Sequence, residues 1–416
     1  MPDEFGKKEE ETYSFLQETR KDEQIKPKKI ITNVCKIAGK GLVFGLAACL
    51  AFCGIKPWAE ALFEQRTDVV TIPEDEELEV GEVLEQEMQQ QEYTVENYRE
   101  MSGVLTEVAK EAVKSVVTVE MAGDATNLEN LGEKAESVSG VIVWKNLAEV
   151  LVAAPSRILD GEGTHIQITF YDGKTYEAKL KKQDKNSRLA VFSVVTPSLK
   201  DSTKNHIRAA TLGNSNVVTK GMPVIALGNQ FGYAGGSGYG IISTVNNYIS
   251  VADRAYRVLT TDITAAENGS TILFNTDGEV IAIGDQVVTG QESTTLVTGY
   301  AISGIKEVVE LLSNGYGVPY IGIRGVEITE EISNEQGIPQ GIYVKGIESD
   351  SPAMQSGIQN GDIVVSVEGE TVKTLYGLGK VISKYKVGDH VKIAVQRQGA
   401  EAYAEVPFDV TIGSKE

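Results

Sequence analysis

The stretch "TDITAAENGSTILFNTDGEVIAIGDQ", residues 261–286, carries strong local signals for the fold. It holds two short apolar runs, at 271–275 and 280–284, with Asp277-Gly278 between them. An Asp-Gly pair between apolar runs is a strong signal for a tight β-hairpin. The stretch therefore predicts two antiparallel strands, and a polar loop at 267–271 precedes the first of them.

The same pattern continues on both sides of this hairpin. Short apolar runs separated by turns are "VSGVIVW", "EVLVAAP", "HIQITFYDGKTYEAKL", "LAVFSVV", "GMPVIALG", "YGIISTVNN", "YRVLTTD" and "TGYAIS". Strands at this spacing, with Asp172-Gly173 as a second hairpin turn, predict an all-β barrel or sandwich. An amphipathic helix at 98–116 precedes these strands, and a helix at 303–314 follows them and stops at Gly315.

Length, charge and cysteine usage narrow the class of protein. A chain of 416 residues predicts two folded units plus further segments. Its net charge of -20 argues against nucleic acid as a partner, since phosphate contacts need clustered Lys and Arg. The cysteines, Cys35, Cys49 and Cys53, are all N-terminal, so the remainder has no disulfide framework or Cys-based zinc site. The histidines are scattered and no calcium-loop spacing occurs, so we expect neither metal nor cofactor.

An uncharged apolar run at 41–55, "GLVFGLAACLAFCGI", predicts a membrane helix within 30–58. Lys36 and Lys40 can snorkel and so lengthen the span. Basic residues at 26–29 precede it and acidic residues follow it, which places the tail, 1–29, in the cytoplasm and the folded domains outside. A cleaved signal peptide and a buried soluble helix are the alternatives.

The acidic, Gln-rich segment at 59–92 has too few apolar residues to offset the entropy of ordering. We expect it to be a disordered stalk between the membrane and the folded domains. A short helix around 80–91 is the alternative within it.

The C-terminal region, 315–413, mixes short strands with two predicted helices and resembles a PDZ domain. The resemblance rests on Ser351-Pro352-Ala353, Ser356-Gly357-Ile358 and Asn360-Gly361-Asp362-Ile363-Val364, together with Tyr320-Ile321-Gly322-Ile323 at the place of the carboxylate-binding loop. In that role Gly322 lets successive backbone N–H groups converge on a peptide's terminal carboxylate. The next strand would accept the peptide at its edge, and side chains of Leu375, Leu378 and Ile382 would give specificity.

With the anchor and the all-β domain, the chain resembles the HtrA (Deg) family of membrane-anchored, trypsin-like serine proteases. Blocks similar to the family are "VSGVIV", "FYDGKTYEAKL", "TLGNSNVVTKGMPVIALGNQFG" and "NTDGEVIAIG". The resemblance implies a mainly β fold, with two packed six-stranded barrels at 93–314 and the active site in the crevice between them. It also implies assembly as a homo-trimer, or a mixed assembly with an active paralogue.

The catalytic positions implied by this resemblance are degenerate. A serine nucleophile needs a histidine base and a carboxylate that orients it. Ser156 stands at the histidine position and Arg188 at the aspartate position. Counting forward from 261 places Ser270 at the nucleophile, whereas counting back from 275 places Gly269 there. His165, His206 and His390 all lie elsewhere.

The oxyanion hole of the family depends on a diglycine that is replaced here by Thr271-Ile272. We therefore expect a membrane-anchored pseudoprotease that binds unfolded or C-terminal peptides through its PDZ domain. An active serine endopeptidase with a rearranged site, including a lysine base for Ser270, is one alternative. A structural surface protein with an idle PDZ groove is the other.

Overall fold

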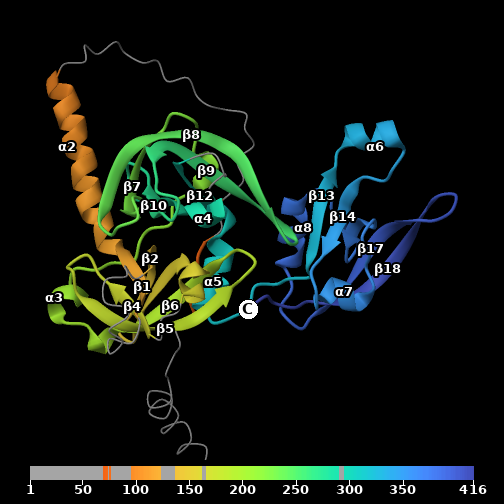
Figure 1. Ribbon diagram of the computed structural model, residues 1–416, viewed down its shortest axis with the longest axis horizontal. Coiled ribbons are helices and arrows are strands. Elements are labelled where there is room, and N and C mark those ends of the chain that lie inside the picture. The colour runs from red at the N-terminus through yellow and green to blue at the C-terminus, as the bar shows by residue number, and fades with distance from the viewer. Residues whose placement is uncertain (1–68, 74, 76–94, 123–135, 162–164, 290–294) are drawn as a thin grey trace, which may run out of the picture. The chain divides into compact units, whose positions relative to one another are not determined.

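The computed structural model describes residues 69–73, 75, 95–122, 136–161, 165–289 and 295–416 (Figure 1). The predicted tail, the membrane helix within 30–58, the three cysteines and most of the predicted stalk lie outside these residues. Among the described helices, none combines the length and apolar character that crossing a bilayer requires. Residues 69–416 belong to one compact unit.

The first barrel follows a long helix. Helix α2 (Val95–Ala112) continues through a short 3-10 turn into a closed barrel with the strand order β1-β2-β3-β6-β5-β4. Its strands are β1 (Val116–Ala122), β2 (Ser137–Lys145), β3 (Glu149–Pro155), β4 (His165–Thr169), β5 (Thr175–Asp184) and β6 (Leu189–Val195). The predicted hairpin at Asp172-Gly173 joins β4 to β5, with Thr169 opposite Thr175. Val119, Ile142 and Phe192 are fully buried inside this barrel.

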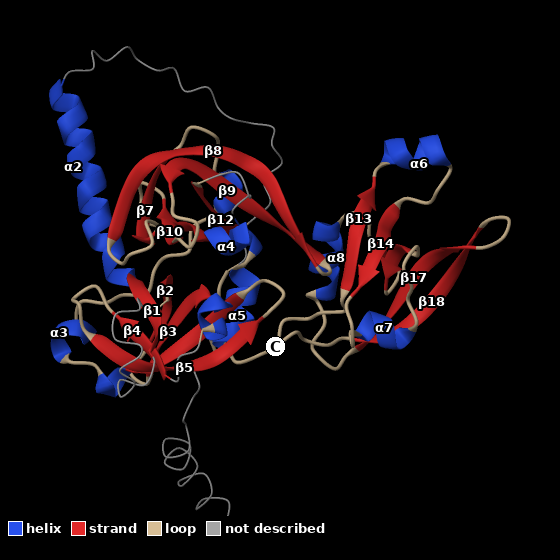
Figure 2. Ribbon diagram, viewed as in Figure 1, coloured by secondary structure: helices blue, strands red, loops and turns tan. Residues whose placement is uncertain are grey.

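The second barrel is built around the hairpin at 271–284. It closes in the order β10-β11-β12-β9-β8-β7. Its elements are β7 (Pro223–Asn229), β8 (Gly236–Val251), β9 (Arg254–Thr264), β10 (Ser270–Phe274), β11 (Val280–Asp285), α4 (Gln286–Thr289) and β12 (Leu296–Ala301). The prediction of two six-stranded barrels is confirmed. Strands β8 and β9 form a long hairpin that extends beyond the barrel (Figure 2).

Helix α5 (Lys306–Ser313) follows, and Gly315 beyond its end has a φ of 76°. That left-handed conformation favours glycine, so the predicted stop is confirmed. Residues 69–73 and 75 pack against this helix. The side-chain amide of Asn314 donates to the Val70 carbonyl (2.8 Å), and the Val70 N–H donates back to it (2.9 Å). The prediction of a disordered stalk was wrong for these residues, because a buried valine and a reciprocal hydrogen-bonded pair fix them.

The PDZ domain is a sheet in the order β13-β14-β15-β17-β18, with β16 beside β15. Its elements are β13 (Ile323–Ile328), α6 (Glu330–Gln336), β14 (Gly341–Ile347), α7 (Pro352–Ser356), β15 (Ile363–Val367), β16 (Glu370–Thr371), α8 (Leu375–Ile382), β17 (His390–Gln398) and β18 (Tyr403–Thr411). The domain has three described helices where the sequence predicted two. The additional helix, α6, has no buried residue, so no apolar stripe marked it in the sequence.

Candidate functional site

A backbone hydrogen bond joins Ser156 and Arg188, two of the predicted triad positions. Ser156 begins a 3-10 helix (Ser156–Asp160) after β3, and its N–H donates to the carbonyl of Arg188 at 2.8 Å. Ser156 is buried, whereas Arg188 is exposed and has a φ of 57°. The chain therefore places Ser156 and Arg188, the predicted histidine and aspartate positions, side by side.

Ser270 is a strand residue that ties the two barrels together. It is fully buried at the start of β10, and its Oγ accepts the Ser139 N–H at 2.7 Å. In return, the Ser139 Oγ donates to the Ser270 carbonyl at 2.9 Å. Both contacts join the second barrel to β2 of the first. The hydroxyl of Ser270 is thus part of the packing between the barrels.

Gly269 occupies the turn before β10, and that turn has no room for a side chain. Its N–H donates to the Ala266 carbonyl at 2.9 Å, and its carbonyl accepts the Gln286 N–H at 2.9 Å. A Cβ at this position would lie 2.5 Å from the Gln230 carbonyl oxygen. A serine there would require the backbone to move, and the N–H that would serve an oxyanion is already bonded.

Arg157 is the residue of this crevice that sequence reasoning missed. Its side chain is 5% exposed, and its Nε donates to Asp285 Oδ1 at 2.9 Å. Its Nη2 donates to the Asn268 carbonyl at 2.8 Å, and its Nη1 pairs with Glu136. The guanidinium of Arg157, next to the predicted histidine position, therefore binds both β11 and the predicted nucleophile loop. The available signal was an arginine inside the otherwise apolar run "VLVAAPSRIL".

The electrostatics of the crevice follow from this ion pair. Burial raises the pKa of Asp285, while Arg157 and Arg188 act to lower it. The carboxylate of Asp285 is paired with the Arg157 guanidinium, and no histidine among the described residues bonds to it. The arrangement stabilises the junction of the barrels and offers no proton acceptor to Ser270.

All three histidines are described, and they lie on separate elements away from Ser270. His165 is exposed at the start of β4, His206 Nδ1 bonds the Ser202 carbonyl (2.7 Å), and His390 Nδ1 bonds Thr411 Oγ1 (3.1 Å). The described residues contain no cluster of three His, Cys, Asp or Glu that could hold a metal.

A lysine base for Ser270 also lacks support in the described part of the chain. Burial lowers the pKa of Lys145, which makes it the candidate on β2. Its Nζ donates to the carbonyls of Lys204 and Ile207 at 2.6 and 2.9 Å, whereas the Ser270 hydroxyl bonds Ser139.

The predicted carboxylate-binding loop of the PDZ domain holds a carboxylate from within the chain. Backbone N–H groups of Ile321, Gly322 and Ile323 donate to the side chain of Asp253 at 2.7–3.0 Å. Gly322 has a φ of 93°, and a Cβ there would lie 2.2 Å from Ser351 Cβ. Only glycine fits this position, as the proposed role of the loop requires. Tyr320, which begins the loop, is buried and donates its hydroxyl to Glu348 at 2.7 Å.

The predicted specificity residues of helix α8 are closed off in this structure. Leu375, Leu378 and Ile382 are at most 3% exposed and pack in the core of the PDZ domain. The same apolar cluster includes Ala255 of β9. The sequence predicted side chains along an open groove, but here they face buried apolar neighbours.

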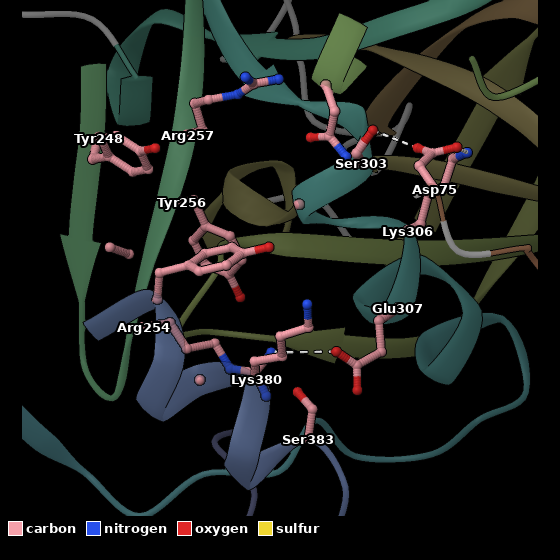
Figure 3. Close-up of a pocket in the computed structure, with 15 residues that line it drawn as sticks. Asp75, Tyr248, Arg254, Tyr256, Arg257, Ser303, Lys306, Glu307, Lys380 and Ser383 are labelled. Carbon is pink, nitrogen blue, oxygen red and sulfur yellow. Dashed lines mark hydrogen bonds and ion pairs between the residues drawn. The ribbon is translucent and has the colours of Figure 1, made fainter. Parts of the chain in front are cut away.

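A cavity of about 350 Å³ lies beside this contact (Figure 3). Arg254 points across it to Glu307, with 3.8 Å between nitrogen and oxygen. Lys306 pairs with Asp75 at 2.8 Å, and Arg257 donates to a backbone carbonyl. These cations are matched by groups of the chain itself, so the cavity is a polar junction and not a vacant anion site.

Two family models match the chain. A model described as a trypsin-like peptidase domain matches residues 138–283, and a model described as a PDZ domain matches residues 319–408. The first match runs from β2 into β11, and the second runs from the loop before β13 into β18.

Similar proteins come from bacteria. The serine protease Do-like HtrB of Bacillus subtilis (strain 168) is 30% identical over 283 residues, which are 63% of this chain and 59% of the relative. A probable periplasmic serine endoprotease, DegP-like, of Halomonas elongata is 29% identical over 240 residues, 56% of this chain and 49% of the relative. The chain thus spans about half to three fifths of the length of these relatives.

Among solved structures, the HtrA-type protease AlgW with a decapeptide has a TM-score of 0.54 at 20% identity. The match covers 75% of this chain and 99% of that one. A serine endoprotease from Yersinia pestis gives a TM-score of 0.51 at the same identity. These likenesses concern the fold.

Proposed function

The chain belongs to the HtrA-like family, with a trypsin-like peptidase domain and a C-terminal PDZ domain, and we propose that it is a catalytically silent member that binds peptides. The observation that carries this proposal is the state of the crevice. Arg157 and Asp285 form a buried ion pair in it, and Ser270 is committed to Ser139. Triad residues act as a unit, so a site with Ser156 and Arg188 at the histidine and aspartate positions supports binding rather than hydrolysis.

The test compares the purified full chain with its Ser270→Ala variant. We expect neither to degrade unfolded casein and neither to react with a fluorophosphonate probe, while an active trypsin-family protease in the same assay does both. Labelling of Ser270, or casein turnover that Ser270→Ala abolishes, would favour the alternative of an active endopeptidase with a rearranged site.

The proposed ligands are unfolded segments and C-termini of proteins, bound at the PDZ domain. Support comes from the three converging N–H groups of residues 321–323 and from β13, which lies at the end of the strand order, where a peptide strand could add. The related protease AlgW was solved with a decapeptide. If the groove were idle, no peptide with a free carboxylate would bind.

We also propose that residues 30–58 anchor the chain in a membrane with the folded domains outside the cytoplasm. The apolar run at 41–55 and its basic flank support this topology. Protease added to intact cells should remove the folded domains and leave a membrane-bound N-terminal fragment. Recovery of the intact chain in the soluble fraction would contradict the proposal. Assembly as a homo-trimer, or with an active paralogue, is a further proposal that light scattering and co-purification can test.

A further inference from the structure

The PDZ site contains a carboxylate that belongs to the same chain. We propose that the β8–β9 hairpin is an intramolecular ligand of the PDZ domain, with the Asp253 side chain in the place of a peptide's C-terminal carboxylate. A peptide then binds only by displacing the hairpin. This inference rests on the peptide-binding function proposed above and adds a competitor to it.

The hydrogen bonds of Asp253 reproduce those that a terminal carboxylate needs. Its Oδ2 accepts the N–H groups of Ile321 and Gly322, both at 2.8 Å. Its Oδ1 accepts those of Ile323 at 2.7 Å and Gly322 at 3.0 Å. Asp253 is fully buried, so no water competes for these charge-assisted bonds. The three donors that a peptide would use are all taken.

The backbone of the hairpin tip also imitates a bound peptide. The N–H of Asp253 donates to the carbonyl of Ile323, the first residue of β13, at 2.7 Å. A peptide that adds to this edge makes its first main-chain bond at the same strand. The tip therefore occupies the beginning of the binding edge as well as the carboxylate loop.

An apolar side chain completes the likeness. Ala255, two residues after Asp253, is buried in one cluster with Ile321, Ile323 and Leu378. In PDZ recognition such a pocket receives an apolar side chain of the ligand. The pocket here is thus covered by the hairpin.

The residue type at the turn fits this role. The turn joins β8 to β9 through Ala252 and Asp253, and Asp253 has a φ of 65°. Glycine meets such a φ without steric cost. The turn geometry therefore does not explain why residue 253 carries a carboxylate. The three N–H groups of the loop, which that carboxylate accepts, do explain it.

Neighbouring contacts hold the tip in place. Arg254 donates to the Pro319 carbonyl at 3.2 Å, and a Cβ at Gly379 of α8 would lie 2.8 Å from its Cγ. On the other side, Asn186 donates to the carbonyl of Ala252 at 2.8 Å. The hairpin is held from both domains, so its release would change a contact between the second barrel and the PDZ domain.

The test uses the full chain and a fluorescein-labelled decapeptide that ends in valine with a free carboxylate. The same peptide with a C-terminal amide is the ligand control. Asp253→Ala removes the competing carboxylate, and Asp253→Asn keeps its shape but loses its charge. Asp277→Asn, an exposed residue in the β10–β11 turn, is the charge-matched control.

We expect both Asp253 variants to bind the carboxylate peptide at least about tenfold more tightly than the unchanged chain, because a site that is open less than a tenth of the time loses that factor in affinity. The Asp277→Asn control and the amide peptide should show no gain. Equal affinity in the unchanged chain and in both Asp253 variants would overturn the inference and leave peptide binding intact.

If no peptide binds, amide hydrogen exchange of residues 321–323, whose N–H groups donate to Asp253, still tests the inference. We expect the exchange of these amides to be at least about tenfold faster in Asp253→Ala than in the unchanged chain. Faster exchange without any peptide binding would support the intramolecular ligand and refute the peptide-binding function. Unchanged exchange in both Asp253 variants would overturn the inference itself.

Discussion

The buried guanidinium of Arg157 gives the strongest test of how the candidate site between the two barrels is held together. Arg157→Met keeps the length and apolar volume of the side chain and removes its charge and donors. Two unit charges at the 2.9 Å separation of Arg157 and Asp285 attract by about 6 kcal/mol at an effective dielectric constant of about 20. Desolvation of both groups offsets much of that attraction.

Removal of one partner leaves the other charge buried, which typically costs about 3–5 kcal/mol. We expect a loss near 3 kcal/mol, because Arg188 remains close to Asp285 and retains part of the attraction. Asn268 contributes to the loss, since its carbonyl is left without the Arg157 donor.

The assay is urea denaturation of the full chain, followed by tryptophan fluorescence, to which Trp144 on β2 contributes. Arg208→Met is the matched control, because Arg208 pairs with Glu111 while the two side chains are 58% and 45% exposed. Such a surface pair is worth under about 1 kcal/mol. A loss in Arg157→Met no larger than in Arg208→Met would refute the reasoning.

A double variant isolates the cause of the loss. Arg157→Met combined with Asp285→Asn removes the uncompensated charge as well, so it should be more stable than Arg157→Met alone. A double variant that is less stable than the single one would show that the side chain of Asp285 has another role.

Three further outcomes follow from the structure. Ser139→Ala should cost about 1–3 kcal/mol in urea denaturation, because the Ser270 carbonyl loses a buried donor. Asn314→Ala should release residues 69–75, seen as new cleavage near Val70 in limited proteolysis, since both hydrogen bonds to Val70 disappear. Burial raises the pKa of Asp253 from 3.8 to about 6, although the hydrogen bonds that its carboxylate accepts act to lower it. Protonated Asp253 therefore contributes up to about 3 kcal/mol to the stability of the fold. This contribution is complete below pH 3.8 and is lost as the pH rises through 6. Asp253→Asn should flatten that part of the stability profile.

Much of the fold was predictable because its signals are local. The Asp277-Gly278 pair predicts a hairpin from two residues, and the short apolar runs on either side predict its strands. Gly315 predicted the end of α5 for the same reason, since glycine adopts the left-handed conformation at a lower steric cost than other residues. Helix α6 escaped prediction because its only signals are a cap and a glycine, with no buried face.

At the candidate site, the sequence predicted the residue types at the triad positions but not the contacts that these residues make. Ser156 and Arg188 are read directly from the sequence, so the prediction that the histidine and aspartate positions lack an imidazole and a carboxylate needed no structure. What fills the crevice could not be read, because Arg157 and Asp285 are 128 residues apart. The sequence also left Ser270 and Gly269 as alternatives for the nucleophile position, because the choice depends on where β10 begins. Pairing of β10 with β7 determines that start.

The sequence by itself determined the strands, the tight turns and the PDZ loop around Gly322, because each depends on neighbouring residues or on a single side chain. Only the tertiary structure decided that Arg157 pairs with Asp285 and that Asp253 occupies the PDZ loop. Partners of buried charges are chosen by packing between distant segments, and a charged residue in a turn has no local pattern that names its partner.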